Sequence, residues 1–206
     1  MGQYYKICFK NNGEIHTNNR KYGDGHEYEM AKLMEHSYIH NWLMDSVAKF
    51  IHKNPTNLLW CGDYTEENNE VENATGGDVS YDDIWGEEEK MKNRFIFPLC
   101  KRFGYKNRYF VNHTKKEYIS FDKYFEKIGD EDLIINPISL LTALGNGRGG
   151  GDYYGDYPNT DKVGYWKWDL ISIENKIPEG YTELDIYFKE EELKNEEDSK
   201  ETVDKD

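Results

Sequence analysis

Apolar residues recur at steps of three and four positions between Met30 and Ile51, which is the spacing of one face of a helix. Pro55 ends this pattern, because proline lacks the amide hydrogen that a continuing helix needs. The sequence therefore predicts one main helix over about residues 28–53. A break near Ser37 would divide it in two.

Strand-like segments lie on both sides of this helix. They are rich in tyrosine, phenylalanine, isoleucine and valine and are bounded by turn residues. A second, short helix is expected at about residues 137–144, where the apolar run ISLLTAL follows a proline, and SFDKYFEKIG offers a further helical turn. Together these elements predict an α+β fold with a mostly antiparallel sheet. The expected strands are residues 3–9, 57–64, 94–100, 107–113, 116–120, 132–136, 163–174 and 181–188.

The chain is long enough for one domain with a hydrophobic core, since 37% of its 206 residues are hydrophobic. We expect this domain to span residues 1–188. The remainder, residues 189–206, contains nine acids and four lysines, and its large apolar side chains are those of Leu193 and Val203. Because so few apolar groups do not offset the entropy lost on ordering a segment, we expect an acidic, disordered tail.

The net charge of −14 is unevenly distributed along the chain. An acidic segment, residues 63–89, has eleven carboxylates and no lysine or arginine, and a basic segment, residues 90–116, has nine lysines and arginines and no carboxylate. Tyrosine, valine, isoleucine and tryptophan side chains punctuate the acidic segment and would anchor it to the body of the protein. The acidic segment is then either an exposed interaction surface or is neutralised internally by the basic segment. Its carboxylates are Asp63, Glu66, Glu67, Glu70, Glu72, Asp78, Asp82, Asp83, Glu87, Glu88 and Glu89.

The glycine-rich loop GNGRGGGDYYGDY, residues 145–157, contains the spacing G-x-G-x-x-G. In a phosphate-binding loop this spacing follows a strand and begins a helix, whose N-terminal amides face the phosphate. Here the glycines follow the expected helix at 137–144, so we interpret Gly145 as its left-handed C-terminal cap. The loop is then either structural or a binding loop that combines an anion contact with aromatic stacking. The binding residues in that second alternative are Arg148, Tyr153, Tyr154 and Tyr157.

The sequence evidence for a metal site or a nucleophilic site is weaker than that for the acidic segment and the glycine-rich loop. His36 and His40 are four residues apart, as metal ligands on one helix face are, but the sequence has no HExxH motif. Cys8, Cys61 and Cys100 form no C-x-x-C pair and lie in apolar runs, which favours buried, reduced thiols. We therefore assign no catalytic residue, no metal ligand and no cofactor.

The sequence shows no signal for a membrane. No segment approaches the roughly 18 consecutive apolar residues of a transmembrane helix. The opening MGQYYKICFK lacks the apolar core of an export signal. We therefore expect a cytoplasmic protein with no membrane partner.

The sequence contains the separate stretches MGQYYK, AKLMEHSYIHNW, a strand ending in WCGDY, NPISLLTALGNGRGGGDYYGDY and VGYWKWDLISI. Together they resemble a loosely defined family of proteins from bacteriophages and their Gram-positive and related bacterial hosts. The likeness covers about the first 65 residues and residues 136–188, and it excludes the acidic and basic segments. The family has no assigned activity, so the resemblance implies a phage setting, in which small accessory proteins often disarm host defence, and no functional residues.

The charge pattern and the phage setting together favour a non-enzymatic, anti-CRISPR-like inhibitor. Its acidic segment would imitate the phosphates of nucleic acid and bind a cationic host defence protein. We expect no direct binding of nucleic acid, because the acids adjoin the basic segment. The alternative is a binder of a small nucleotide immune signal that uses Arg148 and the tyrosines of the glycine-rich loop. A metal-dependent hydrolase is a second alternative.

Overall fold

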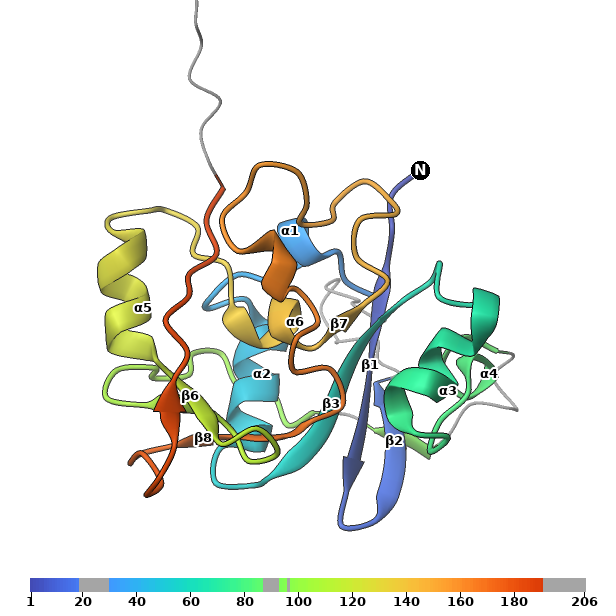
Figure 1. Cartoon of the computed structure of the whole chain (residues 1–206), viewed down its shortest axis with the longest axis horizontal. Helices are drawn as coiled ribbons and strands as arrows, with labels where there is room; N and C mark the ends of the chain where they lie inside the picture. The colour runs from blue at the N-terminus through green and yellow to red at the C-terminus, as the bar shows by residue number, and fades with distance from the viewer. Residues whose placement is uncertain (19–29, 87–92, 96, 191–206) are drawn as a thin grey trace, which may run out of the picture.

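The computed structural model describes residues 1–18, 30–86, 93–95 and 97–190. Within these residues nine strands form one mostly antiparallel sheet accompanied by six α-helices, which confirms the predicted α+β fold (Figure 1). The strand order is β4-β2-β1-β3-β8-β5-β6-β9, and β7 pairs with β3 beside this path. The strands are β1 (Tyr5–Asn11), β2 (Glu14–Asn18), β3 (Thr56–Gly62), β4 (Asn93–Phe95), β5 (Tyr109–Asn112), β6 (Glu117–Ser120), β7 (Ala143–Leu144), β8 (Leu170–Glu174) and β9 (Thr182–Glu183). The helices are α1 (Leu33–His36), α2 (Trp42–Ile51), α3 (Glu70–Thr75), α4 (Tyr81–Trp85), α5 (Phe121–Ile128) and α6 (Pro137–Leu141), with the 3-10 turns η1 (Glu67–Asn69) and η2 (Thr160–Lys162).

The predicted main helix is two shorter helices, so the single element over 28–53 is wrong and the break near Ser37 is confirmed. Helix α1 ends at His36, and Ser37 is its C-cap. His40 then has a left-handed backbone with φ of 68°. The side chain of Asn41 accepts a hydrogen bond from the backbone N of Leu43 at 2.9 Å and starts α2.

The second predicted helix is shorter than 137–144. Helix α6 ends at Leu141, and the next residues form β7, which pairs in parallel with Trp60 and Cys61 of β3. Gly145 therefore follows a strand, and its interpretation as a helix cap is wrong. Its φ of +94° is nevertheless left-handed. The local sequence shows the helical propensity of this run, but it does not show the pairing with β3 that competes with it.

Other boundaries differ because local propensity does not report tertiary pairing. Residues 132–136 were predicted to form a strand, but in the structure Ile135 makes only an isolated bridge with Tyr38. In the predicted strand 163–174, the extended part is β8, and the residues from Gly164 to Trp168 form turns. The sequence prediction missed β2, α3 and α4.

The two faces of β1 and β3 belong to different hydrophobic clusters. Successive side chains of a strand point to opposite faces, so Ile7 and Trp60 enter the main core whereas Cys8 and Cys61 enter a second, smaller cluster. Figure 1 shows α2 and α6 on one side of β1 and β3, with α3 and α4 on the other. The sheet therefore carries the acidic segment on the face opposite α2.

The acidic segment is anchored to the sheet by its apolar residues, as the sequence predicts. Val71, Val79 and Ile84 are each at most 1% exposed and belong to the second cluster. Tyr81 and Trp85 pack against this cluster. Burial of these side chains fixes α3 and α4, and it leaves their carboxylates at or near the surface.

Candidate functional site

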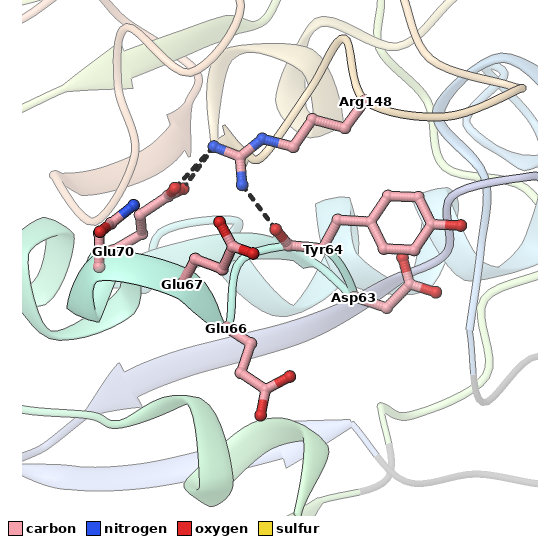
Figure 2. A pocket seen from close by; sticks show the side chains of 7 residues that line it. Asp63, Tyr64, Glu66, Glu67, Glu70 and Arg148 are labelled. Atoms are coloured by element: carbon pink, nitrogen blue, oxygen red, sulfur yellow. Dashed lines mark hydrogen bonds and ion pairs between the residues drawn. The ribbon is translucent and has the colours of Figure 1, made fainter.

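An open hollow of about 560 Å³ lies between the start of the acidic segment and the glycine-rich loop (Figure 2). Four carboxylates and one guanidinium line it, which leaves a formal charge of −3. Such a lining attracts cationic groups and repels anionic ones. The lining residues are Asp63, Tyr64, Glu66, Glu67, Asn68, Glu70 and Arg148.

The chain reaches the hollow directly after β3 and turns sharply there. Asn68 and Asn69 have φ of 61° and 52°, a left-handed conformation that asparagine adopts more readily than most side chains. This turn leads into α3 and places Glu70 at its first residue. At the other end of the hollow, the carboxylate of Asp63 accepts a hydrogen bond from the backbone N of Tyr4 at 3.2 Å. Burial raises the pKa of Asp63 above its usual range.

Arg148 is bound to the acidic segment. Its Nη2 donates to both carboxylate oxygens of Glu70 at 2.7 Å, and its Nη1 donates to the carbonyl of Tyr64 at 2.5 Å. Figure 2 shows the Arg148 side chain reaching toward these two acceptors while Glu66 points away from them. The cation of the glycine-rich loop is thus already neutralised by the chain.

The amides of the glycine-rich loop surround a carboxylate of the protein itself. Asp152 Oδ2 accepts hydrogen bonds from the backbone N of Gly147 at 2.8 Å, of Arg148 at 2.9 Å and of Gly149 at 3.1 Å. Its Oδ1 accepts from the hydroxyl of Tyr5 at 2.7 Å. Asp152 is 3% exposed. Consecutive amides of this kind form an anion-binding nest, and here the anion is Asp152.

The glycine-rich loop is also joined to the N-terminus of the chain. The backbone N of Gln3 donates to the carbonyl of Gly150, and the N of Gly150 donates to the carbonyl of Met1, both at 3.0 Å. A Cβ on Gly149 would lie 2.7 Å from the backbone N of Gln3, so only glycine fits there without a shift. Two of the stretches that carry the resemblance, the MGQYYK opening and the glycine-rich loop, therefore pack against each other.

The tyrosines of the loop do not gather around Arg148. Tyr153 is fully buried, and its hydroxyl donates to the carbonyl of Pro158 at 2.6 Å. Tyr157 stacks on it with ring centroids 5.0 Å apart. Tyr154 is 56% exposed. The structure therefore brings Arg148 together with the acidic segment, whereas Tyr153 and Tyr157 belong to the packing of the loop.

The remaining predicted carboxylates are spread over η1, α3, α4 and the turns that join them. Asp78 pairs with Lys10 at 2.8 Å, and the hydrogen bond from Lys10 holds its pKa below the usual range. Asp83 and Ser80 form a capping box at the start of α4. Glu66, Glu67 and Asp82 are exposed and Glu72 is half-buried. Residues 87–89, which include the last three predicted carboxylates, lie outside the described residues.

Among the described residues, the ion pairs found for the acidic segment are made with cations outside the basic segment. Glu70 pairs with Arg148 and Asp78 pairs with Lys10. In the basic segment, Lys115 pairs with Asp169 at 2.5 Å. Part of the acidic charge is therefore neutralised internally, though by cations that the sequence analysis did not pair with it.

The candidate metal ligands and thiols have other roles. The Nδ1 of His36 accepts a hydrogen bond from the backbone N of Lys32, and His40 contacts the buried carboxylate of Asp45 at 3.3 Å. Across residues 1–18, 30–86, 93–95 and 97–190, no group of three histidine, cysteine or acidic side chains has a geometry that would hold a metal ion. Burial raises the pKa of Cys61 to about 12, so its thiol stays protonated at neutral pH.

Two carboxylates that organise the structure, Asp152 and Asp45, were missed by the sequence analysis. Asp45 is fully buried and accepts hydrogen bonds from the backbone N of Phe103 at 2.7 Å and the hydroxyl of Tyr105 at 2.9 Å. Its position among buried α2 residues was the available signal, since a charged group inside an apolar face needs partners. For Asp152, the signal was an acid directly after a glycine run whose amides need an acceptor.

Comparisons with protein-family models, with curated proteins and with solved structures found no match. In the part of the chain that the structure describes, no helix has the length and apolar character needed to cross a membrane.

Proposed function

We propose that the protein is a non-enzymatic inhibitor of the anti-CRISPR-like kind, which binds a cationic, nucleic-acid-handling defence protein of a host cell. The hollow between the acidic segment and the glycine-rich loop is the observation that carries this proposal. Four carboxylates and one guanidinium line the hollow, and that guanidinium is held by Glu70. The phage setting implied by the resemblance supplies the host-defence context.

Exposed carboxylates on a rigid support can imitate the phosphates of nucleic acid. Glu66 and Glu67 are exposed in the turn before α3, and Asp82 is exposed on α4. Buried Val71 and Ile84 hold the two helices on the sheet. A partner with a basic groove would be attracted at long range, so association would be fast and sensitive to salt. Lysine or arginine side chains of the partner would occupy the hollow.

The same geometry disfavours an anionic ligand. A nucleotide would enter a hollow with surplus negative charge and would have to compete with Glu70 for Arg148. The amides of the loop are already used by Asp152. The nucleotide-signal alternative therefore has less support than the cationic partner.

The experiment is capture of host proteins on the immobilised full chain at about 0.1 M and about 1 M salt, where the Debye length falls from about 10 Å to about 3 Å. We compare the natural chain with the variant Glu66→Gln, Glu67→Gln, Asp82→Asn. The matched control is Glu126→Gln, Asp130→Asn, Glu179→Gln, which removes three exposed carboxylates elsewhere.

We expect a captured protein that is lost at high salt, displaced by duplex DNA, lost with the first variant and kept with the control. Capture that resists DNA and is equal for both variants would contradict the proposal. A protein captured through its nucleic-acid site must release the inhibitor when nucleic acid is added. Displacement by DNA therefore distinguishes phosphate imitation from non-specific adsorption.

A further inference from the structure

Exposed cations lie beside α2, which Figure 1 shows on the side of β1 and β3 opposite α3 and α4. Residues 97–105 run along this helix and are fixed to it by hydrogen bonds. The backbone N of Cys100 donates to the Ser46 hydroxyl at 3.0 Å, and the backbone N of Phe103 donates to the buried carboxylate of Asp45 at 2.7 Å. This part of the basic segment therefore has a defined position on a rigid helix.

The outer side of this segment combines cations with apolar groups. Leu99 is 49% exposed and Trp42, the first residue of α2, is 37% exposed. Lys101 Nζ lies 5.8 Å from the ring centroid of Trp42. Lys101, Arg102 and Lys106 are exposed, and none of the ion pairs found among the described residues includes them. We call Trp42, Leu99, Lys101 and Arg102 the cationic face.

The described chain ends beside the entry to the same helix. Glu190 accepts a hydrogen bond from the Tyr38 hydroxyl at 3.2 Å, and Tyr38 precedes Trp42 by four residues. Lys189 is fixed by an ion pair with Glu131 at 2.6 Å. The acidic tail beyond this point, residues 191–206, has eight carboxylates and three lysines and thus a charge of −5.

We propose that the acidic tail, residues 191–206, docks on the cationic face and shields it from anionic ligands such as nucleic acid. A segment of this length spans at most about 50 Å, more than the roughly 30 Å diameter of a small domain, so the cationic face is within reach. Opposite charge selects this face, whereas Asp130 and Asp132, which are exposed on either side of the Glu131 that pairs with Lys189, repel the tail. Because the two parts share one chain, their effective concentration is of the order of millimolar.

The contact is tested directly with a nitroxide label on the full chain. The label is placed by Ser199→Cys in a Cys100→Ser background, in which Cys8 and Cys61 are buried. At low salt we expect broadening of the nuclear magnetic resonance signals of the Trp42 indole and of the amides of Leu99, Lys101 and Arg102. The broadening should disappear at about 1 M salt and with Lys101→Glu, Arg102→Glu. Broadening absent at low salt, or equal over the whole surface, would overturn the proposal.

Shielding is tested with a fluorescent single-stranded oligonucleotide and a full chain whose tail is neutralised by Glu191→Gln, Glu192→Gln, Glu196→Gln, Glu197→Gln, Asp198→Asn. The control removes five exposed carboxylates elsewhere by Glu14→Gln, Glu126→Gln, Asp156→Asn, Asp161→Asn, Glu179→Gln. We expect the tail variant to bind at least about tenfold more tightly than the natural chain at low salt, and Lys101→Glu, Arg102→Glu to remove the gain. An equal gain in the control would show that net charge alone is responsible and would overturn shielding.

Discussion

Arg148 and Glu70 form a two-point contact in which Nη2 of the guanidinium donates to both carboxylate oxygens at 2.7 Å. The contact joins the glycine-rich loop to the first residue of α3 across 78 positions of sequence. It connects the two segments that the sequence presents as rival binding sites. Because Glu70 already occupies the guanidinium, the hollow between them has a cation-attracting character.

Replacing Arg148 separates the two functional hypotheses. In Arg148→Gln, Glu70 loses its partner and the hollow becomes more negative, so an arginine-rich peptide should bind faster and more tightly, as measured by surface plasmon resonance at low salt. The control Lys176→Gln removes one exposed cation elsewhere and should change binding less. The unfolding free energy should fall by less than about 1 kcal/mol, because the pair is partly exposed. A nucleotide binder would instead lose its ligand with Arg148→Gln, and weaker peptide binding would contradict the acidic hollow.

Asp152 is expected to be essential for stability. Replacement by alanine removes the acceptor of three partly buried loop amides and of the buried Tyr5 hydroxyl, and leaving a buried polar group unsatisfied costs about 1–3 kcal/mol. Chemical denaturation of Asp152→Ala should therefore show a loss of several kcal/mol. The exposed neighbour Asp156 provides the control, since Asp156→Ala should change stability by about 0.5 kcal/mol or less. Similar effects of the two substitutions would mean that the amide nest is not the support of the loop.

The stability of the protein should decrease on mild acidification through His113. Its Nε2 lies 2.8 Å from the hydroxyl of Ser172 and its Nδ1 lies 3.1 Å from that of Tyr181. Burial lowers the pKa of His113 from 6.5, with Glu174 acting in the opposite direction. As the pH falls, His113 is therefore protonated in the unfolded chain before it is protonated in the folded one. Its contribution to the unfolding free energy is complete above about pH 6.5 and is lost below it.

Thermal unfolding between pH 8 and pH 5 checks this dependence. The variant His113→Gln should lose part of the decrease in midpoint below about pH 6.5. A part should remain, because burial also lowers the pKa of His36. An unchanged pH profile in His113→Gln would show that protonation of His113 is not coupled to folding.

Removing residues 191–206 is expected to change the midpoint of thermal unfolding by less than about 5 °C, equivalent to roughly 1 kcal/mol in a domain of this kind. The tail has few large apolar residues, and contacts between exposed charges contribute little to stability. Differential scanning calorimetry of chains 1–190 and 1–206 measures this difference. A larger fall would mean that the tail docks through apolar packing, and the salt dependence expected for the cationic face would then be absent.

Local sequence determined the parts of this protein that depend on neighbours along the chain. Runs of large apolar residues bounded by turn residues located β1 and β3, and Pro55 correctly marked the end of the helical region. The apolar residues of the acidic segment indicated that it is anchored, and Val71, Val79 and Ile84 are buried accordingly. These features are visible in the sequence because side-chain periodicity and backbone restriction act over a few residues.

Only the tertiary structure decided which distant groups meet. The central place of β3 between β1 and β8 turned the end of a predicted helix into β7, and it brought Arg148 to Glu70. Asp152 likewise meets Tyr5 across 147 positions. Which cation or amide a carboxylate binds depends on long-range packing and on the burial that removes competing water. Composition and residue spacing do not report packing or burial, so the sequence identified the charged segments and the fold placed them in contact.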